Sequence, residues 1–85
     1  MDFCYALNAL REGKKVARKG WNGKGMFIYL VGPGAYEPST VVAMEYYKGN
    51  LVPYQPYIAM KTANETVVPW LASQTDLLAE DWEIV

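Results

Sequence analysis

The chain has 85 residues, a formal net charge of −1, a single cysteine and no histidine. This length predicts one domain spanning residues 1–85, and the cysteine and histidine counts exclude an internal disulfide, a Cys/His zinc site and a histidine-based triad. The near-neutral charge argues against binding of duplex nucleic acid, which needs a broad basic surface. Because no signal peptide and no apolar run of about 18 residues is present, we expect a cytosolic protein without a membrane partner.

Hydrophobic residues make up 52% of the chain, which also contains seven tyrosines. A chain this short buries only roughly 60–65% of the surface of its unfolded form, so part of its apolar surface stays exposed. Tyrosine is favoured where one end of a side chain is dry and the other is wet, as at interfaces. The composition therefore predicts a homo-oligomer.

The first part of the chain predicts one helix and two strands. Apolar side chains at three- and four-residue spacing predict a helix over residues 3–12, with Asp2 as its N-cap and Gly13 as its C-cap. A short strand over residues 16–18 follows, and glycines then break regular structure. Residues 26–31 are all apolar or aromatic, which predicts a strand that is covered on both faces.

Glycine and proline mark residues 32–38 as a loop, and a cap at Ser39 or Thr40 favours a short second helix up to residue 47. The rest of the chain predicts strands over residues 52–54 and 57–62, a turn at Asn64 and Glu65, a return strand over residues 66–72, a helical turn over residues 77–80 and a last strand over residues 82–85. Pro69 indicates a sheet edge or a bulge in the return strand. The predicted fold class is α+β, with one N-terminal helix packed on an antiparallel sheet of about five strands and a short second helix.

Four polar side chains stand in a row between two tryptophans in the segment VPWLASQTDLLAEDW, residues 68–82. The polar residues are Ser73, Gln74, Thr75 and Asp76, and the tryptophans are Trp70 and Trp82. Flat apolar faces beside a polar cluster are typical of a site for a small polar ligand that contains rings. The alternative is a polar turn in which Thr75 or Asp76 caps a short helix while the tryptophans lie in the core.

A second candidate group surrounds Trp21 in the glycine-rich loop. A purine stacks well on an indole, Arg18 is a candidate for binding a phosphate, and Asn22 offers an amide to a ribose or a base edge. Together with the polar row these residues indicate a nucleotide-like ligand. The alternative is that Trp21 only attaches the loop to the core.

Catalysis has less support in the sequence. Asp76, Glu80 and Asp81 lie close together and could act as a carboxylate pair or bind a hard cation. However, no nucleophile with an adjacent base and no phosphate-binding P-loop is found. We therefore expect no enzyme, no cofactor and no metal, and we keep as alternatives a hydrolase that uses Asp76 or Asp81 and a structural or protein-interaction module.

Long and unusual patterns carry a family resemblance. They are DFCYALNALREGKKV near the start, ARKGWNGKGMFIYL, PYIAMKTANETVVPW, and LASQTDLLAEDWEIV at the end. On these patterns the chain resembles the phage proteins of the second Thoeris anti-defence family.

The resemblance implies a protein that binds and hides cyclic ADP-ribose isomers made by bacterial TIR-domain sensors, without cleaving them, in the cytoplasm of the infected host. It also implies a homotetramer with ligand pockets at subunit boundaries, and in some relatives a separate site for cyclic oligonucleotides of the CBASS pathway. Matched by motif, the ligand-binding residues would be Trp21, Asn22, Trp70, Ser73, Gln74, Thr75 and Asp76. Arg18 joins them on physical grounds alone.

Overall fold

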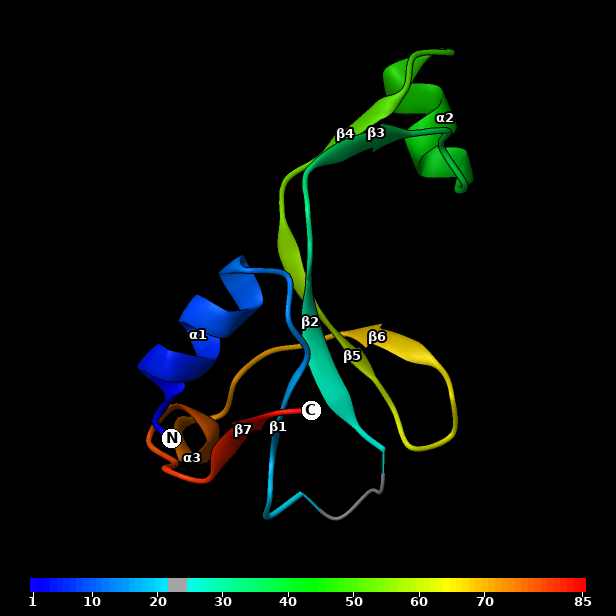
Figure 1. Ribbon diagram of the computed structural model, residues 1–85. Coiled ribbons are helices and arrows are strands. Elements are labelled where there is room, and N and C mark those ends of the chain that lie inside the picture. The colour runs from blue at the N-terminus through cyan, green and yellow to red at the C-terminus, as the bar shows by residue number, and fades with distance from the viewer. Residues whose placement is uncertain (22–24) are drawn as a thin grey trace.

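The computed structural model describes residues 1–21 and 25–85. In this part of the chain, seven strands and three helices form an α+β fold with a long helix at the N-terminus (Figure 1). The predicted fold class is confirmed, including the five-stranded antiparallel sheet and the short second helix. The strand predicted over residues 52–54 is confirmed, but its partner strand in a small two-stranded sheet was not predicted, and the third short helix begins earlier than expected.

Helix α1 (Phe3–Arg11) begins where the sequence predicts and ends one residue earlier, with Glu12 rather than Gly13 as its C-cap. The side chain of Asp2 accepts a hydrogen bond from the Tyr5 N–H, which satisfies one of the free donors of the first turn. After the C-cap at Glu12, Gly13 adopts a φ of 85°, a conformation that glycine reaches without strain. Alanines and one leucine of α1 pack on the sheet, so the helix covers one of its faces.

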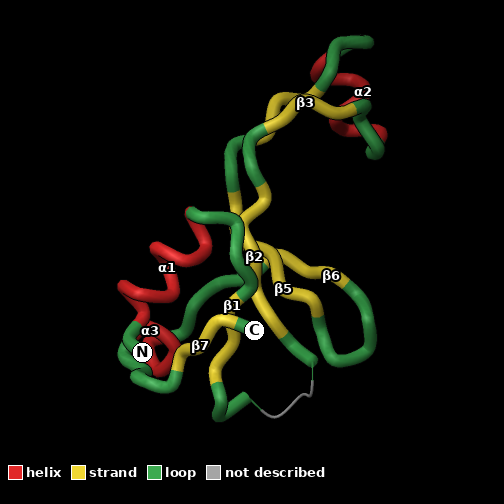
Figure 2. The backbone as a smooth tube through the Cα atoms, viewed as in Figure 1, coloured by secondary structure: helices red, strands yellow, loops and turns green. Residues whose placement is uncertain are grey.

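The main sheet has the strand order β6–β5–β2–β1–β7, and all neighbouring strands are antiparallel (Figure 2). Its strands are β1 (Val16–Arg18), β2 (Phe27–Val31), β5 (Tyr57–Lys61), β6 (Val67–Pro69) and β7 (Trp82–Ile84). Strand β6 is shorter than the return strand predicted over residues 66–72, and Pro69 lies in an edge strand as expected. The turn before β6 is confirmed, with Glu65 at a φ of 66°.

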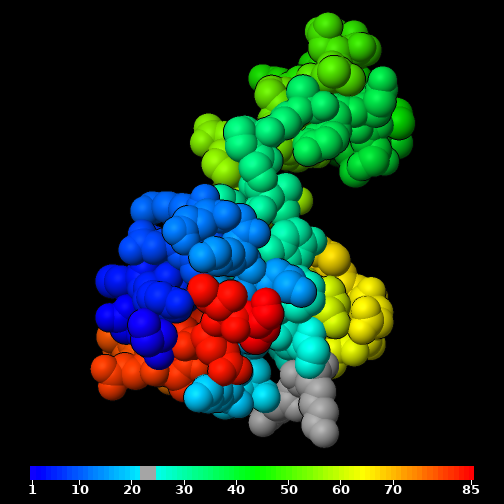
Figure 3. All heavy atoms as spheres, in the orientation of Figure 1, coloured from blue at the N-terminus to red at the C-terminus, as the bar shows by residue number. Residues whose placement is uncertain are grey.

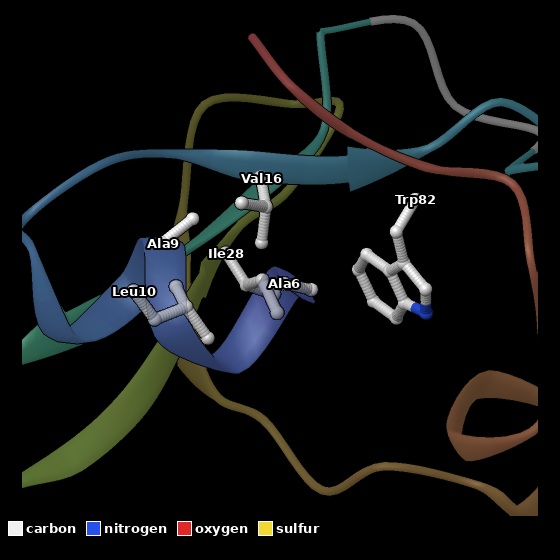
Figure 4. Packing of buried hydrophobic residues seen from close by; sticks show 6 residues of the cluster. All are labelled: Ala6, Ala9, Leu10, Val16, Ile28 and Trp82. Carbon is white, nitrogen blue, oxygen red and sulfur yellow. The ribbon is translucent and has the colours of Figure 1, made fainter. Parts of the chain in front are cut away.

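The core lies between α1 and the sheet (Figure 4). Its fully buried members come from α1, β1, β2 and β7, and they are Ala6, Ala9, Leu10, Val16, Ile28 and Trp82. The prediction that both faces of the strand around Ile28 are covered is wrong. Phe27, Tyr29 and Val31 alternate with Ile28 on the opposite face and remain half-buried, because α1 packs on one face only.

Residues 32–56 form a projecting arm (Figures 1 and 3). The arm contains a two-stranded sheet, β3 (Gly34–Tyr36) paired with β4 (Val52–Tyr54), and helix α2 (Val41–Tyr47) between these strands. Thr40 caps α2 as predicted, whereas the expected loop over residues 32–38 contains β3. The radius of gyration is 15.3 Å, compared with about 12 Å for a compact domain of this length.

None of the seven residues of α2 is buried, and Val41, Val42 and Tyr46 are highly exposed. The arm therefore adds little to the core and presents apolar surface to its surroundings. Helix α3 (Gln74–Leu77) is the shortest of the three helices in the described residues, and it precedes β7. Across residues 1–21 and 25–85, no helix is long and apolar enough to cross a membrane.

Candidate functional site

Arg18, the last residue of β1, lies between two carboxylates from the C-terminal part of the chain. Its Nη1 is 2.9 Å from Oδ1 of Asp76, and its Nε is 2.8 Å from Oδ1 of Asp81. All three side chains are largely shielded from solvent. Because the two carboxylates come from either end of the α3–β7 connection, the guanidinium joins that connection to β1.

Asp81 also holds the start of the glycine-rich loop. Its Oδ2 accepts a 2.9 Å hydrogen bond from the Gly20 N–H, and its backbone oxygen accepts one from the Lys19 N–H. A Cβ at position 20 would lie 3.0 Å from Oδ2 of Asp81, so glycine permits this close approach. The sequence indicated Asp81 only as a possible member of a catalytic carboxylate pair or a ligand of a hard cation. Its role as an anchor depends on a partner 61 positions away.

Hydrogen bonding keeps both carboxylates ionised. Partial burial alone would raise the pKa of Asp76, but hydrogen bonds from Arg18, Ser73 and Trp21 outweigh it and hold this pKa below its ordinary value. The pKa of Asp81 is lowered by Arg18 and by the Gly20 N–H. The same contacts, first Asp81 and then Asp76, raise the pKa of Arg18. A general acid at neutral pH needs a raised pKa, so neither carboxylate is suited to that task.

Trp21 belongs to an aromatic cluster whose other members are Phe3, Trp70 and Trp82. The Trp21 ring meets Trp82 edge-on at 5.3 Å and Trp70 at 6.5 Å between centroids. Its Nε1–H donates a long hydrogen bond, 3.4 Å, to Oδ1 of Asp76. Trp21 is therefore attached to the core, which is the alternative that the sequence left open. It also remains partly exposed, as does Trp70.

Ser73, rather than Thr75 or Asp76, is the N-cap of α3. Its Oγ accepts from the Asp76 N–H, while Oδ2 of Asp76 accepts from the Ser73 N–H, so the two residues form a capping box. The expected helical turn over residues 77–80 thus lies three residues earlier. The Thr75 hydroxyl lies 2.8 Å from Ser73 Oγ. Much of the polar row is therefore explained by helix capping, which was the alternative interpretation of this segment.

A groove of about 490 Å³ opens beside Trp21. It is lined by Lys15, Ala17, Arg18, Lys19, Trp21, Gly25, Met26, Phe27, Glu83 and Val85. Its size falls within the range of small-molecule sites. Two residues predicted from the sequence, Arg18 and Trp21, contribute to it. Lys15 and Phe27 were not predicted as site residues. Residues 15, 17 and 19 alternate along a strand and therefore share one face of it, so the sequence could have indicated that Lys15 and Lys19 lie on the same side.

None of the other predicted residues that the structure describes lines this groove. Trp70 lies in the aromatic cluster, and Ser73, Thr75 and Asp76 lie at the start of α3 next to it. Gln74 lines a separate shallow hollow with Leu77 and Leu78. Asn22 lies outside the described residues. Among the residues that are described, no group of three or more Cys, Asp or Glu side chains is arranged to hold a metal ion.

The fold and this site define a small α+β protein with an aromatic cluster next to a cationic groove. Comparison with known families shows a match of residues 1–85 to the Thoeris anti-defense 2-like domain. The chain belongs to this family. It is 41% identical to Thoeris anti-defense 2 of Bacillus phage SP01 over 85 residues, which covers 100% of this chain and 94% of that relative. The resemblance identified from the sequence patterns is confirmed.

Proposed function

We propose that this protein is an anti-defence sponge that binds cyclic ADP-ribose isomers and keeps them from the Thoeris effector of the bacterial host. Family membership over residues 1–85 supports the connection with Thoeris signalling. The name of the phage SP01 relative, Thoeris anti-defense 2, supports the same connection. Such a role places the protein in the cytoplasm of the infected cell, where the signal is made.

The groove beside Trp21 is the structural observation that carries the proposal. It combines an indole and a phenyl ring with lysines on one small surface. A cyclic ADP-ribose isomer has a flat base and a pyrophosphate, which match aromatic and cationic side chains respectively. The ring of Trp21 is held by its contacts with Trp82 and Asp76, so little conformational freedom is lost when a base stacks on it. The same chemistry extends the proposal to cyclic oligonucleotides of CBASS.

Capture without cleavage is part of the proposal. The chain has no histidine, and Asp76 and Asp81 are committed to Arg18 with lowered pKa values. A carboxylate with a lowered pKa is a poor proton donor. Hydrolysis would also need a general base to activate the attacking water, and both carboxylates are already paired with Arg18. We therefore expect the ligand to leave the protein unchanged.

Assembly into a homotetramer, built as a dimer of dimers, completes the proposal. The arm supports it, because α2 exposes an apolar surface that a lone chain has no means to cover. Symmetry-related copies of the same chain are the usual way to bury such a surface. Ligand pockets at the subunit boundaries would then combine the Trp21 groove with residues of a second copy.

The test is capture followed by release. The purified protein is incubated with a cyclic ADP-ribose isomer, separated from free ligand and denatured, and the released molecule is analysed by chromatography and mass. Recovery of the intact isomer in stoichiometric amount is expected. Recovery of a cleaved product would instead identify a hydrolase, and the sponge role would be rejected.

A second candidate is a structural or protein-interaction module. It is favoured by one observation, namely that Trp21 and Trp70 pack against Trp82 rather than standing alone in a loop. In such a module the aromatics would serve the core and the oligomer contacts only. Release of no ligand at all in the capture experiment would support this candidate.

A further inference from the structure

Arg18 is poorly placed to bind a phosphate. Its guanidinium is already bonded to two carboxylates, at 2.9 Å and 2.8 Å, so the three side chains together carry a charge of −1. An incoming phosphate would have to displace Asp76 or Asp81 and would then face the carboxylate that it displaced. If the groove holds a nucleotide, other cations must meet its phosphates.

Strand β1 supplies such cations on its outer face. Val16 and Arg18 point to the side of the sheet on which α1 packs, so Lys15, Ala17 and Lys19 alternate with them and share the opposite side. The ladder continues to Lys15, whose backbone oxygen accepts from the Val85 N–H. Ala17 is buried and small, and it forms a floor between the two lysines.

Across the sheet, Ala17 has Glu83 on one side and the Phe27 strand on the other. Ala17 is paired with Glu83, and the pairing of Val16 with Ile28 brings Phe27 next to Ala17. Glu83 approaches Lys19 only to 4.0 Å, and the Lys19 side chain is 71% exposed while that of Glu83 is 42% exposed. This contact is weak and screened by water, so an anion with two charges can replace it.

The ring of Phe27 holds Lys15 over the groove. Lys15 Nζ lies 4.9 Å from the ring centroid, and Lys61 Nζ lies 5.5 Å from the same centroid. Lys61 already has a carboxylate partner, Glu65, at 3.1 Å. In the described residues, Lys15 is held by an aromatic face instead of a carboxylate. Its ammonium is thus kept in place while its charge stays available.

We propose that Lys15 and Lys19 bind the pyrophosphate of the sequestered nucleotide over Ala17, and that Arg18 acts as a positioning residue. This inference rests on the proposed function and specifies which side chains of the groove meet the anionic part of the ligand. Arg18 holds Asp81 and Asp76, and these in turn hold Gly20 and Trp21. The two lysines therefore provide the positive charge that meets the ligand, whereas Arg18 fixes the positions of the residues around it.

The experiment measures binding of a cyclic ADP-ribose isomer by calorimetry to the full chain and to Lys15→Gln, Lys19→Gln and the double variant. Because each substitution removes one charge-assisted hydrogen bond to the ligand, we expect affinity about tenfold lower in each single variant and about a hundredfold lower in the double variant. Lys14→Gln is the matched control, since Lys14 is an exposed neighbour paired with Glu12 at 3.4 Å. It should change affinity less than about twofold.

Two further measurements separate charge from packing. Lys15→Arg keeps a cation over Phe27 and should bind the isomer almost as tightly as the unsubstituted protein. Lys15→Met keeps the aliphatic part of the side chain without the charge and should bind as weakly as Lys15→Gln. Binding by the unsubstituted protein should weaken as salt is raised from about 50 to 300 mM, and that dependence should be smaller in the double variant. Thermal melting of each variant confirms folding, and we expect it to be nearly unchanged because Lys19 is 71% exposed and makes only a 4.0 Å contact.

The outcomes distinguish the two proposals. If the unsubstituted protein does not bind the isomer, both the proposed function and this inference are overturned. If it binds, and the folded double variant binds equally well with the same salt dependence, only this inference is overturned. A decrease in affinity that Lys15→Arg restores and Lys14→Gln does not share supports it.

Discussion

Asp76 accepts hydrogen bonds from Arg18 and Trp21 on a single oxygen, Oδ1, at 2.9 Å and 3.4 Å. Its other oxygen, Oδ2, accepts from Ser73 and completes the capping box of α3. One carboxylate therefore fixes the start of a helix, the end of a strand and the indole of the candidate site. Its removal should affect stability and the geometry of the site together.

The first prediction concerns the charge of Asp76. From the sequence alone, Asp76→Asn would leave the melting temperature nearly unchanged, because asparagine caps a helix about as well as aspartate. In the structure, the substitution also removes the ion pair with Arg18. We therefore expect the melting temperature to fall by about 2–6 °C, because a single ion pair that water still reaches in part contributes only modestly to stability. An unchanged melting temperature would show that Asp81 alone suffices to hold Arg18.

The second prediction concerns the cap itself. Ser73→Ala removes the acceptor for the Asp76 N–H, which should cost about 0.5–2 kcal/mol. Thr75→Val is the control, because the Thr75 hydroxyl contacts the Ser73 hydroxyl at the exposed surface and is not itself the cap. Chemical denaturation should rank Ser73→Ala as clearly less stable than Thr75→Val. Equal stabilities would mean that the cap is supplied in another way.

The third prediction concerns pH. The pKa values of Asp76 and Asp81 lie below their ordinary value of 3.8 in the folded protein. Their contribution to stability is therefore fully present above about pH 4, and it is lost as the pH falls through the lowered folded values. Melting curves from pH 7 to pH 2 should show this decline. The double variant Asp76→Asn/Asp81→Asn should decline less steeply, and an identical slope would argue against the role of this pair.

The fourth prediction concerns Trp21 and Trp70. If a base stacks on these rings, replacing either tryptophan by alanine should lower ligand affinity by at least about tenfold. Both rings also pack against Trp82, so alanine will reduce stability as well. Trp21→Phe keeps an aromatic ring while it removes the donor to Asp76. Calorimetry should therefore place Trp21→Phe between the unsubstituted protein and Trp21→Ala, provided that each variant is folded.

The fifth prediction concerns the arm. Val42 and Tyr46 are each 78% exposed on α2, so Val42→Glu and Tyr46→Glu remove apolar surface without disturbing the core. If copies of the chain meet through the arm, light scattering should show that both variants form smaller species than the unsubstituted protein. Lys48→Glu changes the charge next to α2 but removes no apolar side chain, and it should leave the mass unchanged. A monomeric mass for the unsubstituted protein at micromolar concentration would contradict the homotetramer.

Local patterns in the sequence were sufficient to predict several helices and strands. The spacing of apolar residues and the cap at Asp2 predicted α1, and Thr40 predicted α2, because a helix is stabilised by residues three and four positions apart. Alternation and turn residues predicted the strands around Asn64. The family patterns identified the chain without reference to any contact.

The elements that were missed or misplaced depend on contacts that the local sequence pattern does not show. Strand β3 was not predicted because its residues show no strand pattern of their own. It forms by pairing with β4, and α2 separates the two strands in the sequence. Helix α3 starts three residues before the predicted helical turn. The reason is that Ser73, and not Thr75 or Asp76, supplies the side-chain oxygen that accepts a hydrogen bond from a free N–H of the first turn.

The sequence by itself determined the α+β class, the family and the residue types of the candidate site. Only the tertiary structure decided which of them meet. Arg18 was predicted to face a phosphate, yet Asp76 and Asp81, 58 and 63 positions away, bond its guanidinium. Lys15 and Phe27 lie in different parts of the chain and form one wall of the groove. A charged side chain bonds whichever partner folding places within about 3 Å of it, and that distance is not encoded in any local pattern.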